Sequence, residues 1–172
     1  MTTLSRGSEW RKWDLHVHTK NTNKNDQFTS IDFEAFCEIL FKKAIEKNID
    51  VIGITDYFCV EKYKKVIDYQ SNIQYHTAFL DEEKAIIKKI LILPNVELRM
   101  LPATDSGRLI NIHCIFSPSY IANIENDFFS SLKHNSLHTR LINHKFFVEQ
   151  SISEFLTDIL YCQWSYNHFA SS

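Results

Sequence analysis

The sequence predicts a single α/β domain, and three neighbouring segments carry that prediction. Residues 13–19 (WDLHVHT) alternate polar and apolar side chains, as a β-strand does. Between residues 31 and 47 the apolar side chains recur at intervals of three and four, which indicates one face of an amphipathic helix. Residues 50–55 (DVIGIT) form a short apolar run, typical of a parallel strand covered on both faces. Strand, helix and strand in this order predict a βαβ unit.

The other elements follow from the same kinds of pattern. Ser30 is the expected N-cap of the first helix, and Asp32 and Glu34 favour its positive end. Further along the chain the pattern predicts two helices, two strands and two more helices, at residues 60–68 and 81–90, 91–101 and 109–117, and 121–132 and 152–160. A turn-rich stretch separates the two strands, which makes them neighbours along the chain.

Composition narrows the class of protein. With 172 residues and 44% hydrophobic content, the chain is large enough to bury a core. A formal net charge of -2 argues against a broad basic surface for nucleic acid, and three glycines are too few for a glycine-rich nucleotide loop. The four cysteines are scattered without a CxxC pair, which predicts reduced thiols and a cytoplasmic location. No apolar run is long enough to span a bilayer, so we expect no membrane association.

His16 and His18 give the sharpest local signal. Residues two apart on a strand point to the same side, so both imidazoles can ligate one metal ion. Asp14, predicted on the same face, can accept a proton from a ligand imidazole and fix its tautomer. Exposed or hydrogen-bonded histidines without a metal are the alternative interpretation of such a pair.

Polar side chains also fall on the other predicted strands. Asp56 ends the second strand, where a buried carboxylate needs a metal or several donors, although capping the next helix explains it equally well. Glu97 lies inside the third strand and is a good ligand for a hard cation, unless Arg99 on the same face pairs with it. His113 lies in the fourth strand, where a hydrogen-bonded core histidine is the simpler explanation when it is taken alone. Taken together, these residues predict a site at the ends of the strands.

Four segments resemble the motifs of PHP (polymerase and histidinol phosphatase) domains. They are RGSEWRKWDLHVHT at residues 6–19, GITDYF at 53–58, PNVELR at 94–99 and INIH at 110–113. The resemblance covers residues 7–129 approximately. The first segment resembles in particular the PHP domains at the head of large proteins that continue into an SMC-like or AAA-type ATPase.

The resemblance implies an α/β fold of a particular kind, a partial, distorted (β/α)7 barrel of PHP type. It would place the metal-binding domain at residues 7–133, followed by a poorly defined, partly helical segment at 134–172. The activity implied is hydrolysis of a phosphate ester or nucleic-acid phosphodiester by a metal-activated water. An ATPase domain or subunit is the implied partner.

The resemblance also assigns roles to residues. His16, His18 and Glu97 would hold metal, with Glu97 bridging, and His113 would bind a further ion. Zinc, manganese and iron all fit this mixed ligation, so the divalent metal is not decided. Asp56 is the expected catalytic residue. Arg99 and Arg108 are candidate contacts for the substrate phosphate, although solvated arginines are more common.

The sequence also departs from the PHP pattern. Tyr57 stands where a ligand histidine is usual, and the loop after His18 offers only Asp26 in place of a third histidine. The closing Asp-x-His motif is absent, so we expect a chain that stops early. The alternative function is therefore a truncated or degenerate module that binds metal, nucleotide or a protein partner without turnover. An amidohydrolase is disfavoured because the sequence shows no context for a metal-bridging lysine.

Overall fold

The structure, a computed structural model, describes residues 10–22, 26–28, 31–100 and 110–130, without the side chains of residues 99, 100 and 110. Its elements follow in the order β1 (Lys12–His18), α1 (Phe33–Lys47), β2 (Ile49–Tyr57), α2 (Glu61–Ser71), η1 (Ile73–Tyr75), α3 (Asp81–Ile87), β3 (Leu91–Met100), β4 (Ile110–Ile115), η2 (Pro118–Tyr120), α4 (Ile121–Asn123) and the π-helix η3 (Ile124–Phe129). Every strand and helix predicted within this part of the chain is present, with shifted ends. The predicted helix at 152–160 lies outside the described residues.

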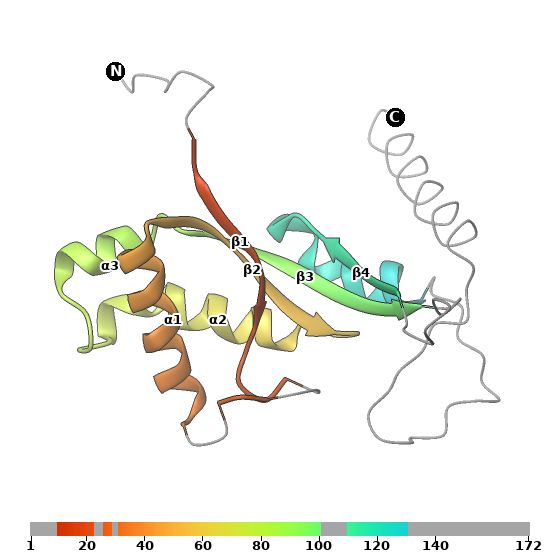
Figure 1. The fold of residues 1–172 in the computed structure, drawn as a ribbon, viewed down its shortest axis with the longest axis horizontal. Coiled ribbons are helices and arrows are strands. Elements are labelled where there is room, and N and C mark those ends of the chain that lie inside the picture. The colour runs from red at the N-terminus through yellow and green to blue at the C-terminus, as the bar shows by residue number, and fades with distance from the viewer. Residues whose placement is uncertain (1–9, 23–25, 29–30, 101–109, 131–172) are drawn as a thin grey trace.

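The four strands form one curled sheet with the shape of a half-barrel, in the order β1-β2-β3-β4 (Figure 1). β1 pairs with β2 and β2 with β3 in parallel, as the predicted βαβ unit requires. β4 runs antiparallel to β3. A parallel neighbour needs a crossover of about a dozen residues or more, whereas residues 101–109 alone join these two strands. The sheet is therefore mixed, and the described residues do not close it into a (β/α) barrel.

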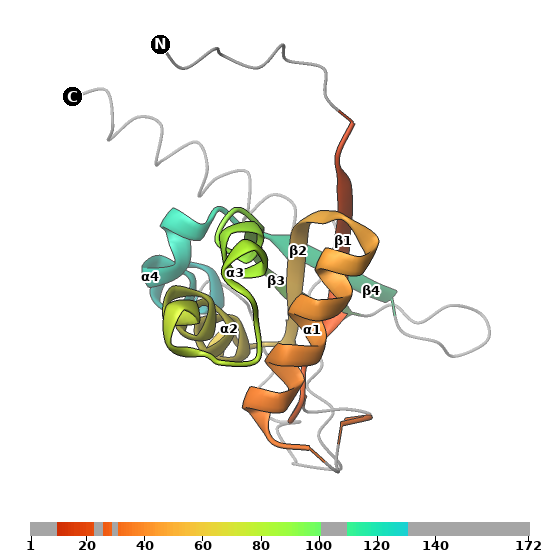
Figure 2. The same cartoon turned by 90° about the vertical axis from the view of Figure 1, so that its left-hand side faces the viewer.

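The helices α1, α2 and α3 lie on one side of the sheet (Figure 2). Their apolar faces and the strands beneath them share a buried core that includes Phe36, Phe41, Ile52, Ile54 and Val66. A second cluster, where η3 packs near β3, contains Val60, Val96, Leu98, Ile124 and Phe128. We call the face of the sheet that carries Ile52, Ile54 and Val96 the outer face, and the opposite face the inner face. Within the described residues, no helix has the length and apolar character needed to cross a membrane.

Asp32, not Ser30, begins the first helix. Oδ1 of Asp32 accepts a hydrogen bond from the backbone N–H of Ala35 at 2.7 Å, which is the contact of an N-cap. Ser30 lies outside the described residues. The helix ends at Asn48, whose left-handed backbone (φ 54°) is a conformation that asparagine adopts more readily than most residues.

A bulge in β1 changes which side chains face inward. Between the pairs Asp14–Ile52 and Val17–Ile54, β1 uses one residue more than β2. An extra residue reverses the alternation of side chains across the bulge. Asp14 therefore lies on the outer side, whereas His18, the next residue after Val17, lies on the inner side.

Gly53 of β2 lies directly against the backbone of this bulge. A Cβ atom at Gly53 would lie 2.4 Å from the carbonyl oxygen of Leu15 and 2.8 Å from its Cα atom. Both neighbours are backbone atoms, which cannot rotate away as a side chain can. The close approach of β1 to β2 therefore requires glycine at this position.

We predict that Gly53→Ala lowers the free energy of unfolding by about 1–3 kcal/mol, because the added methyl group must displace the backbone of β1. Urea denaturation followed by circular dichroism measures the change. Ala122→Ser, at an exposed position of α4, is the control and should stay within about 0.5 kcal/mol of the wild type. An unchanged unfolding midpoint for Gly53→Ala would show that the two strands are not in this close contact.

Candidate metal centre

The strand register gathers polar side chains on the inner face. Thr55 pairs with His18 on one side and with Asn95 on the other. Two residues further along β3, Glu97 pairs with His113 of β4. Because paired residues lie on the same face of a sheet, side chains from all four strands meet in one patch.

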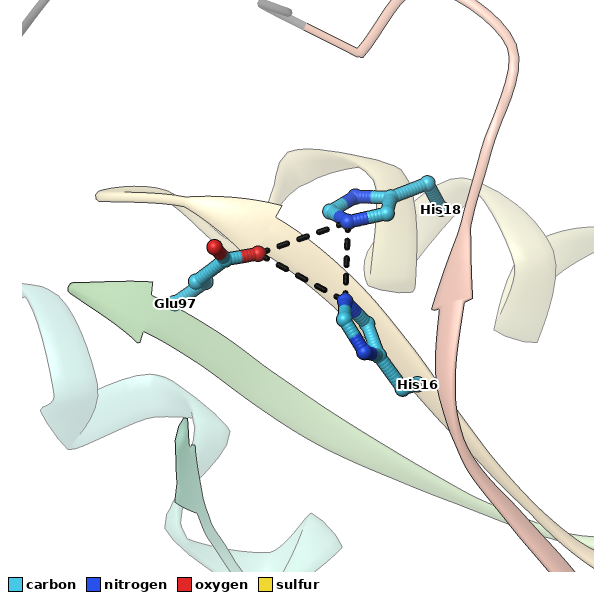
Figure 3. Close-up of side chains that lie close together, drawn as sticks. All are labelled: His16, His18 and Glu97. Atoms are coloured by element: carbon cyan, nitrogen blue, oxygen red, sulfur yellow. Dashed lines mark hydrogen bonds and ion pairs between the residues drawn. The ribbon is translucent and has the colours of Figure 1, made fainter. Parts of the chain in front are cut away.

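Three ligand atoms converge at the centre of this patch (Figure 3). Nε2 of His16 lies 3.0 Å from Nε2 of His18. Oε2 of Glu97 lies 3.6 Å from the first nitrogen and 3.3 Å from the second. Among the described residues, this is the one group of three or more His, Cys, Asp or Glu side chains whose ligand atoms lie within 4.8 Å of one another. We call these three residues the ligand triad.

The separations within the ligand triad fit a single metal ion. With metal–ligand bonds of about 2.1 Å, two ligand atoms are about 3.0 Å apart at a right angle and about 3.6 Å apart at about 120°. The measured separations of 3.0, 3.3 and 3.6 Å span this range. The circle through the three atoms has a radius of about 1.9 Å, so one point can lie at bonding distance from all of them.

The carboxylate of Glu97 is charged although it is only 1% exposed. Burial by itself raises the pKa of Glu97, but a hydrogen bond with His18 and the attraction of His18, His113 and His16 outweigh it, and the pKa lies below its usual value. The carboxylate is therefore ionised at neutral pH. A buried anion of this kind needs a compensating positive charge, which a bound cation supplies.

His113 lies beside the ligand triad. The centroid of its ring is 4.4 Å from that of His16, and the two ring planes meet at 62°. Burial, and then the neighbouring His16, lower the pKa of His113, so its imidazole is neutral at pH 7, the form in which histidine binds metal. The structure thus brings the four predicted ligands together on the inner face, three of them with their ligand atoms in mutual reach.

The prediction that Asp14 shares a face with His16 and His18 is wrong. The bulge in β1 places Asp14 on the outer side, where it pairs with Ile52. Its Oδ1 atom accepts a hydrogen bond from the backbone N–H of His16 at 3.4 Å, rather than from an imidazole. The alternation of the sequence assumes a regular strand, and the extra residue breaks that assumption.

Asp56 also lies away from the ligand triad. It pairs with Val96 on the outer face, and its Oδ2 atom accepts a hydrogen bond from the backbone N–H of Lys62, in the first turn of α2, at 2.9 Å. Burial raises the pKa of Asp56 to about 6, against the lowering effect of that hydrogen bond. This position agrees with the helix-capping interpretation and gives the expected catalytic role no support.

The remaining candidate site residues either lie outside the described part of the chain or have a structural role. Arg108 and the segment 134–172 are outside the described residues, and the side chain of Arg99 is not described. Their contacts with a substrate phosphate stay predictions. Asp26 accepts hydrogen bonds from two backbone N–H groups of its own loop, which is a structural role.

Two further inner-face residues contact the ligand residues. The ring of Tyr57 stacks on the imidazole of His18, with centroids 5.2 Å apart and planes at 17°. Asn95, 2% exposed, donates hydrogen bonds to the carbonyl oxygen of Leu15 at 2.7 Å and to Oγ1 of Thr55 at 3.0 Å. Asn95 is not among the site residues predicted from the sequence. Its position could have been noticed, because an amide within an apolar strand is buried and must find hydrogen-bond partners.

Comparisons with models of protein families, with curated proteins and with solved structures find no match. The resemblance to PHP domains therefore rests on the motif residues of the sequence. The geometry of the ligand triad is what the structure adds to it.

We predict that Asp56→Asn stabilises the protein at neutral pH. The pKa of about 6 in the folded state lies above the ordinary value of 3.8, so the folded protein binds this proton more tightly than the unfolded chain. Stability therefore falls as the pH rises from about 4 to about 6, and the full difference corresponds to at most about 3 kcal/mol. Asparagine can still accept the hydrogen bond from Lys62 but carries no charge.

Urea denaturation at about pH 4 and about pH 7.5 measures this effect. The variant should gain stability over the wild type at the higher pH and lose that advantage at the lower. Asp32→Asn, at the exposed cap of α1, is the matched control and should show no such gain. An Asp56→Asn variant that is less stable than the wild type at neutral pH would show that the pKa of Asp56 in the folded protein is not raised above its ordinary value.

Proposed function

We propose that this chain is the metal-binding part of a metal-dependent phosphoesterase of the PHP type. The observation that carries the proposal is the convergence of His16, His18 and Glu97 within reach of one cation. The motif resemblance points to the same three residues from the sequence. On this proposal, the curled sheet is the first part of a distorted (β/α)7 barrel whose inner face holds the site.

The donor set favours a catalytic metal over a structural one. Catalytic zinc sites use three protein ligands and leave a position for water or substrate, whereas structural sites are closed by four. The ligand triad supplies two imidazoles and one carboxylate, without a thiolate. Zinc, manganese and iron are all compatible with that mixture.

The three side chains of the ligand triad differ in exposure, and this difference leaves the site open to a substrate on one side. Glu97 is 1% exposed, His18 30% and His16 53%. The carboxylate therefore forms the floor of the site and His16 its rim. A ligand in solution can approach from the His16 side, while the buried carboxylate keeps its charge next to the histidines.

The proposed substrate is a phosphate ester or a nucleic-acid phosphodiester. The chain carries a formal net charge of -2, so its overall charge does not attract an anion, and attraction must come from a local positive charge. A bound divalent metal supplies that charge, lowers the pKa of water and neutralises charge on the phosphate oxygens. An ATPase domain or subunit is the partner that the PHP resemblance suggests.

We predict that purified wild-type protein binds one or more equivalents of zinc or manganese and that His16→Ala and Glu97→Gln weaken this binding. Each variant removes one ligand atom, so the loss of affinity should exceed the roughly 10–100-fold cost of removing a group that only orients a ligand. Isothermal titration calorimetry and elemental analysis measure affinity and stoichiometry.

The matched controls are His76→Gln and Glu46→Gln. His76 pairs with Glu34, and Glu46 with Lys43, both outside the ligand triad. Neither control should change metal binding. If the wild type binds no more metal than His16→Ala and Glu97→Gln, the assignment of the ligand triad is wrong.

The activity has its own test. We expect the manganese-loaded protein to hydrolyse bis(4-nitrophenyl) phosphate and expect Glu97→Gln to abolish that hydrolysis, because the variant lacks the charged ligand of the metal. Release of nitrophenol measures the rate. A protein that binds metal through the ligand triad but shows no hydrolysis above the Glu97→Gln background would support the alternative of a binding module without turnover.

A further inference from the structure

The side chain of Asn95, in β3, contacts each of the other three strands. It lies on the inner face of β3, two residues before Glu97, and is 2% exposed. Its amide group reaches the carbonyl oxygen of Leu15 in β1, Oγ1 of Thr55 in β2 and Nδ1 of His113 in β4. A buried amide with contacts on three neighbouring strands can fix their side chains relative to one another.

The contact with Leu15 fixes the orientation of the amide. A carbonyl oxygen can only accept hydrogen bonds, so the Asn95 atom that lies 2.7 Å from it must be the nitrogen Nδ2. That nitrogen carries two hydrogens, yet three atoms lie within hydrogen-bond distance. They are the oxygen of Leu15 at 2.7 Å, Oγ1 of Thr55 at 3.0 Å and Nδ1 of His113 at 3.1 Å.

This count favours one position for the hydrogen on the ring of His113. The two oxygens are the closer partners of Nδ2 and use both of its hydrogens. With both hydrogens of Nδ2 used in this way, the partner that remains for Nδ1 of His113 is Oδ1 of Asn95, an acceptor at 3.3 Å, which favours a hydrogen on Nδ1. The neutral ring carries one hydrogen, so Nε2 keeps its lone pair.

We propose that Asn95 is the positioning residue of the metal centre: it holds His113 in the tautomer with hydrogen on Nδ1 and ties the bulged backbone of β1 to the same anchor. A metal-binding histidine usually donates its other ring N–H to an acceptor, which fixes the tautomer and the ring orientation. Asn95 supplies that acceptor for His113. The inference rests on the proposed function, since the lone pair on Nε2 matters only if His113 binds metal.

The amide of Asn95 also links the part of the site that β1 contributes to the part that β4 contributes. Leu15 lies in the bulge that precedes His16, and the hydrogen bond to its carbonyl oxygen holds that bulge against β3. The same side chain therefore sets the backbone before one candidate ligand and the tautomer of another. A residue with a packing role alone would set neither the tautomer of His113 nor its affinity for metal.

The direct test is nitrogen-15 NMR of histidine-labelled, metal-free protein at about pH 8, well above the lowered pKa of His113. For His113 we expect Nδ1 to show the chemical shift of a protonated nitrogen and Nε2 that of an unprotonated one. This measurement needs no variant. A wild-type His113 with its hydrogen on Nε2, or with a mixture of tautomers, would overturn the proposal.

Two variants separate the contacts of Asn95. Asn95→Asp keeps an acceptor for Nδ1 of His113 but cannot donate to Leu15, so it should retain the tautomer. Asn95→Ala removes both contacts, so His113 should show a mixture of tautomers, and metal affinity should fall by about 10–100-fold, less than on removal of a ligand. Asn111→Ala, at an exposed asparagine of β4, is the control and should change neither readout.

Retention of the wild-type tautomer in a folded Asn95→Ala variant would also overturn the proposal. The outcome is separable from that of the proposed function, because the tautomer is measured without metal or substrate. If the tautomer is as expected but the protein neither binds metal nor hydrolyses a phosphodiester, the phosphoesterase proposal fails while the action of Asn95 on His113 stands.

Discussion

The burial of the Glu97 carboxylate is the constraint on which the rest of the site depends. A carboxylate that is 1% exposed costs several kcal/mol unless donors or positive charge surround it. The sheet meets this requirement by its register, which pairs Glu97 with His113 on one side, and by the bulge of β1, which brings His16 and His18 within 3.6 and 3.3 Å of the carboxylate on the other. The result is a polar centre on the inner face, while the apolar side chains of the outer face pack against the helices.

Much of the fold and of the candidate ligand set could be predicted because the signals are local. The two-residue period of a strand puts His16 and His18 on one side whatever the rest of the chain does. Glu97 and His113 are noticeable because they interrupt apolar strands. The helix that contains Phe36 and Phe41 follows from its period, and the order of strand, helix and strand fixes the parallel pairing of β1 and β2.

The sequence-based predictions fail where a contact with a distant part of the chain decides the position of a side chain. Asp14 changes face because of a bulge that rests on Gly53, a residue of another strand. Asp56 follows a run that is apolar on both faces, so no alternation shows which way its side chain points. The importance of Asn95 depends on its reaching a backbone oxygen of Leu15, 80 residues away in the sequence. For Asp14 and Asp56 no pattern in the nearby chain reveals the contact, and for Asn95 the amide within an apolar strand shows only that a partner is needed, not which one.

X-ray absorption spectroscopy of the metal-loaded protein tests the central claim most directly, because it reports the atoms bound to the cation. For a zinc- or manganese-loaded sample the structure predicts a first shell of nitrogen and oxygen only, with the outer-shell scattering of at least two imidazoles, and loss of one imidazole in His18→Ala. A first shell that contains sulfur, or one without imidazole scattering, would contradict the convergence of His16, His18 and Glu97 on one metal ion.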